Sequence, residues 1–130
     1  MKRGSGYPNL PKVSEEMKAW SAALSVEAGS WPQVATRSFF GFAALYRKDK
    51  MFALLPRTRG METANGLAFR IDAPAVAVRA RLEKDPRIRA AEIQKARWFS
   101  FELASDADLH AALDWLGRAY EAAGKNKKSR

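Results

Sequence analysis

Cysteine is absent from this 130-residue sequence, which excludes disulfides, thiolate nucleophiles, cysteine-ligated zinc and iron–sulfur clusters. Histidine occurs once, at His110, beside the apolar stripe of a C-terminal helical pattern, where we expect a surface side chain. The glycine-rich phosphate loops, the G-x-S-x-G serine motif and the H-E-x-x-H zinc motif are also missing. We therefore expect no enzymatic activity, no cofactor and no bound metal.

Long apolar runs are lacking as well. No segment approaches the roughly 20 apolar residues that a membrane helix requires. The first eight residues contain Lys2, Arg3, two glycines and Pro8, with no apolar core that could act as a signal peptide. The sequence therefore predicts a cytoplasmic protein that does not insert into a membrane.

The composition is that of a globular protein, with 47% hydrophobic and 11% aromatic residues. We predict a flexible N-terminal arm over residues 1–12, one domain over residues 13–124 and a basic tail over residues 125–130. The net charge is +9, but the two ends hold seven of the 23 basic residues and none of the 14 acidic ones. The ends either attract polyanions such as nucleic acid or serve only as solubilising extensions.

A β-hairpin is the clearest local prediction. Two apolar runs, residues 39–46 and 51–56, flank the charged residues 47–50, and residues 67–71 resemble a third strand. Gly41 interrupts the first run, which indicates a bulge or the close approach of another backbone segment.

Helical patterns surround these strands. Ser14 is a candidate N-cap for a helix that ends by Gly29, and Asp72 is a candidate cap for a second helix that ends at Asp85. Ser105 and Asp108 form a capping-box pattern before a third helix that ends at Gly124. Residues 98–103 alternate as a strand, and residues 87–94 include a short one.

The predicted order is therefore helix, three strands, helix, short strand, strand, helix. Because the strands and helices do not alternate regularly, we predict an α+β domain with a hairpin-rich antiparallel sheet packed against helices.

Candidate binding residues are basic or aromatic. The loop between the second and third strands carries Arg57 and Arg59, whose forked guanidinium groups suit phosphate or carboxylate, and Gly60 and Gly66 permit unusual turns near a ligand. The hairpin turn can extend this basic surface or can be an ordinary solvated turn; its basic residues are Arg47, Lys48 and Lys50.

Aromatic side chains on strands are usually core residues in a domain of this size. We expect Trp98 and Trp31 to be exposed exceptions, and Trp98 is then available to stack on a base.

Two stretches resemble known families. Arg37-Ser38-Phe39-Phe40-Gly41, followed by Leu45-Tyr46 and Lys50-Met51-Phe52-Ala53-Leu54, resembles the N-terminal domain of TfoX-type competence regulators. Trp98-Phe99-Ser100-Phe101 with the capped helix that follows is similar to the MmcQ/YjbR family of small bacterial proteins. The resemblance implies a related α+β fold and, only weakly, DNA binding.

Two functions follow as hypotheses. The first is a non-enzymatic bacterial module that binds nucleic acid with little sequence selectivity, through its basic ends and the arginines of the hairpin and loop. The second is a protein-interaction or small-ligand domain whose site lies at the loop from Arg57 to Gly66. The oligomeric state stays open.

Overall fold

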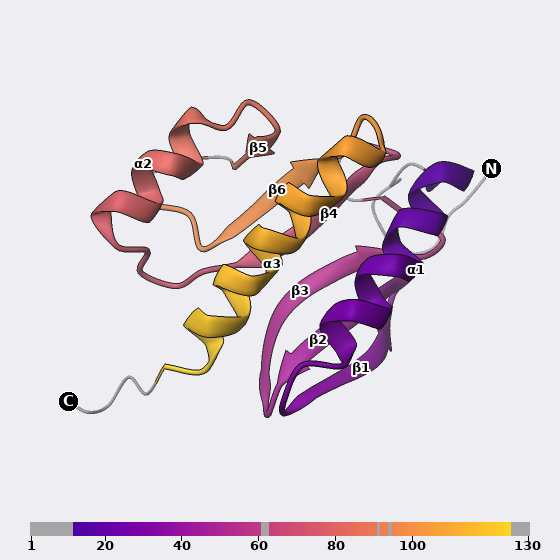
Figure 1. Ribbon diagram of the computed structural model, residues 1–130, viewed down its shortest axis with the longest axis horizontal. Helices are drawn as coiled ribbons and strands as arrows, with labels where there is room; N and C mark the ends of the chain where they lie inside the picture. The colour runs from indigo at the N-terminus through magenta and orange to yellow at the C-terminus, as the bar shows by residue number, and fades with distance from the viewer. Residues whose placement is uncertain (1–11, 61–62, 91, 94, 126–130) are drawn as a thin grey trace.

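A six-stranded antiparallel sheet forms one layer of the molecule, and two long helices lie side by side across one of its faces (Figure 1). The computed structural model describes residues 12–60, 63–90, 92–93 and 95–125. The strand order is β1-β2-β3-β4-β6-β5. The strands are β1 (Val34–Phe39), β2 (Phe42–Arg47), β3 (Lys50–Pro56), β4 (Gly66–Arg70), β5 (Ile88–Arg89) and β6 (Trp98–Glu102). This is the predicted α+β architecture.

Three helices accompany the sheet: α1 (Glu15–Gly29), α2 (Val76–Lys84) and α3 (Leu109–Ala123). Helix α1 contacts β1, β2 and β3, whereas α3 contacts β3 and β4. The shorter α2 lies beyond α3 near β5 (Figure 1). None of the described helices is both long enough and apolar enough to cross a membrane. Most of the expected N-terminal arm, residues 1–11, and the tail from residue 126 lie outside the described residues.

The first helix forms where the sequence predicts it. The Ser14 hydroxyl accepts a hydrogen bond from the Met17 N–H at 3.0 Å, which satisfies one of the free donors at the helix N-terminus. Met17, Trp20 and Leu24 are buried on one face, as their spacing indicates. Both the N-cap and the buried face are confirmed.

The prediction for residues 39–46 was wrong in one respect, because the chain turns inside this apolar run. Phe40 and Gly41 form a two-residue turn between β1 and β2, with φ angles of 48° and 88°. Positive φ at both positions gives the turn the twist that a tight hairpin needs. Gly41 is therefore a turn residue rather than a bulge, and β1 is an additional strand.

The expected close approach at Gly41 is correct. A Cβ atom added there would lie 2.8 Å from the Thr58 hydroxyl oxygen. The Gly41 carbonyl also accepts hydrogen bonds from the N–H groups of Arg57 and Thr58, both at 2.9 Å.

Helix α2 begins later than predicted, and Asp72 does not cap it. The Asp72 carboxylate accepts hydrogen bonds from the Arg70 guanidinium at 2.7 and 3.2 Å. The N-cap position falls on Ala75, whose side chain cannot accept a hydrogen bond. The Asp72 carboxylate, which we expected to cap the helix, therefore pairs with Arg70 instead.

The predicted capping box of the third helix is present. The Ser105 hydroxyl accepts the Ala107 N–H, and the Asp108 carboxylate accepts the Ser105 N–H. A 3-10 turn over Asp106–Asp108 leads into α3.

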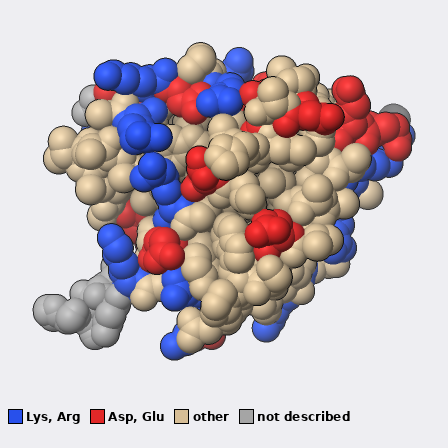
Figure 2. All heavy atoms as spheres, in the orientation of Figure 1, with Lys and Arg blue, Asp and Glu red and all other residues tan. Residues whose placement is uncertain are grey.

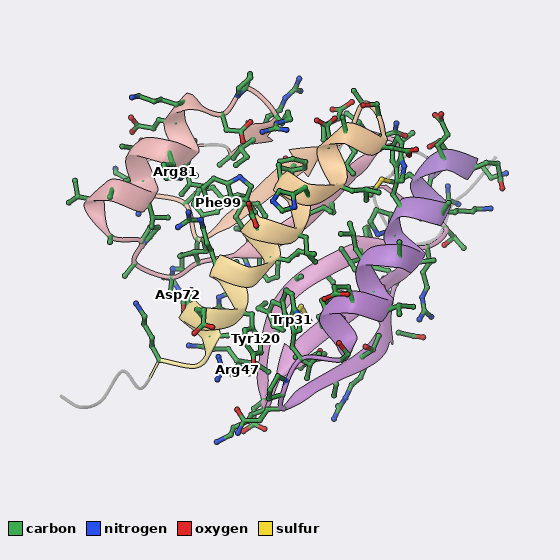
Figure 3. The ribbon with its side chains drawn as sticks, viewed as in Figure 1. Trp31, Arg47, Asp72, Arg81, Phe99 and Tyr120 are labelled. Atoms are coloured by element: carbon green, nitrogen blue, oxygen red, sulfur yellow. The ribbon has the colours of Figure 1, made fainter. Side chains whose placement is uncertain are left out.

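The main core lies between the sheet and the helices. Phe69 on β4 stacks on Phe99 and on Trp115 of α3, with ring centroids 5.6 and 5.5 Å apart. Trp31 and Tyr120 meet at 5.1 Å under the C-terminal half of α3 (Figure 3). This face of the sheet is filled by interlocking aromatic side chains.

Candidate nucleic-acid interface

The predicted basic residues do not form one surface. Arg47, Lys48 and Lys50 lie at the β2–β3 turn, whereas Arg57 and Arg59 follow the other end of β3. Seven extended residues separate the two groups by about 20 Å. The suggestion that the hairpin turn extends the surface of the loop is therefore wrong, because β3 runs directly away from the turn.

Arg47 is held by the helix layer. Its guanidinium lies 4.1 Å from the centre of the Tyr120 ring and donates a hydrogen bond to the Tyr120 carbonyl at 3.0 Å. That carbonyl lies in the last turn of α3 and also accepts the Gly124 N–H at 3.2 Å. Arg47 thus ties β2 to the end of α3 with an additional hydrogen bond, and Figure 3 shows it beside Tyr120. Lys48 is exposed, and Lys50 lies 3.6 Å from Asp72.

The loop between β3 and β4 is bound to its surroundings at several points. The Val13 N–H donates to the Thr58 carbonyl, and the Ser14 hydroxyl donates to the Asn65 side chain at 2.6 Å. A Cβ atom at Gly60 would lie 1.9 Å from the Thr63 carbonyl oxygen, so packing within the loop explains this glycine. The side chains of Arg57 and Arg59 are exposed. A ligand role for the loop stays a prediction.

The second face of the sheet carries no helix among the described residues. Cross-strand pairing places one row of residues on this face, in the strand order β1 to β5. The row is Arg37, Ala44, Leu54, Ala68, Ser100 and Arg89. An arginine stands at each edge, about 24 Å from the other, and the residues between them are mostly small. We call this surface the helix-free face.

Aromatic side chains flank this row. Tyr46 and Trp98 are half-buried and pack against the small cluster that includes Ala44 and Ala68. The Arg37 guanidinium lies 5.3 Å from the centre of the Tyr46 ring. Trp98 is paired with Arg70 on the neighbouring strand. Trp98, predicted to be exposed, is therefore partly accessible and has basic neighbours.

An open groove adjoins Trp98. Its volume is about 570 Å³. Arg70, Lys95, Arg97 and Glu92 line it. Arg70 is paired with Asp72, and the Lys95 ammonium lies 3.8 Å from the Glu92 carboxylate. Arg97 forms no ion pair with the part of the chain that the structure describes.

Charge is unevenly distributed among the segments of the fold. Residues 34–60 contain six Lys and Arg and one Asp, and residues 76–97 contain seven Lys and Arg and three acidic residues. In contrast, α1 has three acidic residues and one lysine, and residues 106–123 have four acidic residues and one arginine. Figure 2, viewed from the helix side, shows acidic side chains at the start of α1 and basic ones over α2. The small net charge of the body therefore conceals two basic segments, the β1–β3 hairpins and the region from α2 to β6, and two acidic ones, α1 and the segment from Asp106 through α3.

The groups with clearly shifted pKa values belong to a structural network. Burial raises the pKa of Asp85, but hydrogen bonds from Arg87 and Trp115 outweigh it and hold the pKa below its ordinary value. A hydrogen bond from the Ala104 N–H lowers the pKa of Asp108, with Arg87 adding to the effect. Arg87 thus bridges two carboxylates and lies 5.0 Å from the Phe101 ring centre, away from the helix-free face.

A further cleft, of about 820 Å³, lies between α3 and the segment before α2. Its charged residues are balanced, with Lys50, Arg118 and Lys125 facing Asp72, Asp114 and Glu121. Within the described residues, no three His, Asp or Glu side chains are placed to hold a metal ion. His110 is exposed, as predicted, with its Nε2 atom 3.7 Å from Asp114.

Comparison of the chain with protein-family models, with curated proteins and with solved structures finds no match.

Sequence reasoning singled out Trp98 but not the residues that share the helix-free face with it. Arg37, Tyr46, Arg70 and Arg89 lie on four different strands, and they share a face only through the register of the sheet. The sequence signal for a shared face was the alternation within each strand. Arg37 and Phe39 are two residues apart, as are Ala44 and Tyr46, so each pair points to one face. The extra turn at Gly41 concealed that alternation.

Proposed function

We propose that the protein is a non-enzymatic module that binds single-stranded nucleic acid on the helix-free face, with little sequence selectivity. The observation that carries the proposal is the cross-strand row that has Arg37 and Arg89 at its ends and Tyr46 and Trp98 beside it. A nucleic-acid ligand also fits the cytoplasmic location expected from the sequence.

The chemistry of the face suits an unpaired strand. Every base has an aromatic surface, so stacking on Tyr46 or Trp98 tolerates any sequence and contributes roughly 1–3 kcal/mol per base. Arginines at the edges bind phosphates, which position the strand without reading its sequence. A duplex hides the faces of its bases, so a stacking surface favours single strands.

Arg47 and Lys50 lie against the helix side, beside Tyr120 and in the cleft next to α3. The other predicted basic residues extend this track: Lys48 lies near the Tyr46 end of the sheet, and Arg57 and Arg59 lie near the opposite end. In this proposal they add phosphate contacts beyond the face, and the basic ends of the chain add charge without specificity. No observation favours the alternative of a small-ligand site at the Arg57–Gly66 loop over the helix-free face.

The test is binding of the full chain to a mixed-sequence single-stranded oligonucleotide and to the same sequence as a duplex, over a salt series. We expect tighter binding to the single strand and affinity that falls linearly, in log–log form, as salt rises. Trp98→Leu, which keeps an apolar side chain over Ala68, should weaken single-strand binding roughly 5- to 100-fold.

Three control variants distinguish the alternatives. Lys18→Gln removes a charge from the acidic helix α1, on the opposite side of the sheet, and should leave affinity unchanged. Arg57→Gln with Arg59→Gln should weaken binding by about the amount expected for two lost phosphate contacts. If the loop variant abolishes binding while Trp98→Leu has no effect, the site is the loop and the proposal fails. Replacing the four basic residues from Lys125 onward with glutamine tests the tail in the same assay.

A further inference from the structure

The two edges of the sheet are protected very differently. Strand β5 contains only two residues and follows Pro86, so that edge offers little backbone for pairing. Strand β1 is six residues long, and all its residues after Val34 are exposed. Among the described residues, none forms a strand along its outer edge. It contains no proline and no recorded bulge. Apart from the single charge of Arg37, β1 carries none of the devices by which sheets normally block such an edge.

The direction of the backbone groups on β1 follows from the turn. In a two-residue hairpin the residues that flank the turn, here Phe39 and Phe42, form a hydrogen-bonded pair. The Gln33 carbonyl accepts the Lys48 N–H at 3.0 Å, which fixes the same alternation at the other end of the strand. Residues 33, 35, 37 and 39 therefore bond to β2, and Val34, Thr36 and Ser38 direct their backbone groups outward.

We propose that β1 pairs with β1 of a second copy of this chain, antiparallel, about a two-fold axis at Thr36. Placing the axis there pairs Thr36 with the partner's Thr36, and Ser38 with the partner's Val34. The outward N–H and C=O groups of one β1 strand then face the outward groups of the other. Thr36 exchanges two hydrogen bonds with its counterpart, and the Ser38 N–H donates to the partner's Val34 carbonyl. The Val34 N–H takes no part, because it donates to the Trp31 carbonyl at 3.2 Å within its own chain.

Side chains select this register over the next one. With the axis at Thr36, Arg37 lies opposite the partner's Ala35, so the guanidinium lies beside a methyl group. A shift of the axis by one residue places Arg37 directly opposite the partner's Arg37, and like charges in that position are destabilising. In the preferred register Phe39, which is 37% exposed, gains the partner's Ala35 as a diagonal neighbour.

Two features favour a second copy over a foreign peptide. Residues 33–40 contain one charged side chain, Arg37, in a chain that is 28% charged, so two copies bring little repulsion to this edge. The last residue of α1, Gly29, lies over Thr36 of β1 and has no side chain. A Cβ atom added at Gly29 would be 3.6 Å from the Thr36 hydroxyl oxygen. At this position α1 therefore presents no side chain over Thr36, the residue at which the two-fold axis is placed. The pairing would join two sheets into one with continuous helix-free faces, but it does not depend on nucleic-acid binding.

The first test is the mass of the full chain in solution, measured by sedimentation over a concentration series. We expect a dimer that Thr36→Pro converts to a monomer of half the mass. The Thr36 N–H points outward, so proline at this position removes no bond between β1 and β2. Thr36→Val keeps the N–H and should stay dimeric. A wild-type chain that is monomeric at about 100 μM would overturn the proposal, as would a folded Thr36→Pro variant that is still a dimer.

A second test is independent of the proline variant and fixes the register. Because the chain has no cysteine, single-cysteine variants report only the designed contact. Residues in a hydrogen-bonded pair have Cα atoms about 5.5 Å apart, within disulfide range. Under mild oxidation Thr36→Cys should form covalent dimers at least tenfold faster than Ala35→Cys or Arg37→Cys alone, and a mixture of the last two should form the heterodimer. Equal rates for the three single variants, or no disulfide at Thr36→Cys, would refute the pairing.

Discussion

The two faces of the sheet are formed by the same strands, but they differ in the size and burial of their side chains. On the helix-covered face, Phe52, Phe69, Phe99 and Phe101 are fully buried against α1 and α3. On the helix-free face, small residues at Ala44 and Ala68 lie between larger residues that keep polar or aromatic surface accessible. Large interlocking side chains fill the covered face, whereas the helix-free face has a small buried cluster at its centre, with Tyr46, Met51 and Trp98 packed against it. The difference indicates that the covered face contributes more to the stability of the fold.

The largest expected effect comes from truncating the covered face. Phe69→Ala removes a ring that stacks on both Phe99 and Trp115, and we expect it to lower the free energy of unfolding by about 3–5 kcal/mol. Trp98→Ala on the other face removes a side chain that is already half in water and should cost less than about 2 kcal/mol. Urea unfolding of the two variants measures the difference. Equal losses would mean that the two faces contribute alike.

Enlarging adjacent residues of β2 tests the same contrast from the opposite direction. Ala43 and Ala44 are both buried but point to the covered and helix-free faces, respectively. Ala43→Leu forces extra atoms into a close-packed core and should destabilise the protein by about 1–3 kcal/mol. Ala44→Leu should cost less than about 1 kcal/mol, because side chains on its face can move outward. Thermal unfolding of both variants suffices, and a larger loss at Ala44 would contradict the comparison.

The loss of stability at low pH should also arise on the helix-covered side of the sheet, at Asp85 and Asp108. Asp85 and Asp108 have pKa values below the ordinary 3.8 when folded, so each stabilises the folded state above that pH. As pH falls below about 4, through the folded pKa values, protonation removes this stabilisation. Arg87→Met, which keeps the apolar stem over Phe101, should lower the free energy of unfolding by roughly 1–2 kcal/mol at pH 7, a value reduced because Arg87 is partly exposed.

The difference between this variant and the wild type should be smaller at pH 3 than at pH 7, because the carboxylates begin to be protonated there. Urea unfolding at pH 3, 5 and 7 gives the comparison. A constant difference between wild type and Arg87→Met across that range would show that the ion pairs do not set the acid response.

Local signals in the sequence predicted most of the fold. Ser14, Ser105 and Asp108 were identified as caps because capping depends on residues three or four positions apart. Gly41 was misread because a bulge and a type I′ turn both require a glycine, and the aromatic residues around it suggested a continuous strand. Asp72 was misassigned because its partner Arg70 lies on a strand whose end the sequence does not specify. The helix-free face could not be predicted, because its members meet only through the register of six strands.

The smallest expected effect on stability concerns the edge of the helix-free face. Arg37 is exposed and contacts the Tyr46 ring at 5.3 Å, an arrangement that contributes about 0.5–1 kcal/mol at most at such a site. Arg37→Gln should therefore change the free energy of unfolding by less than about 1 kcal/mol. Its effect on nucleic-acid binding should be larger, because one phosphate contact is lost and the slope of log affinity against log salt becomes shallower by about 0.7 for a single strand. If Arg37→Gln lowers the stability but leaves the salt slope unchanged, Arg37 stabilises the sheet and does not contact phosphate. The contrast between the two faces would then not extend to β1.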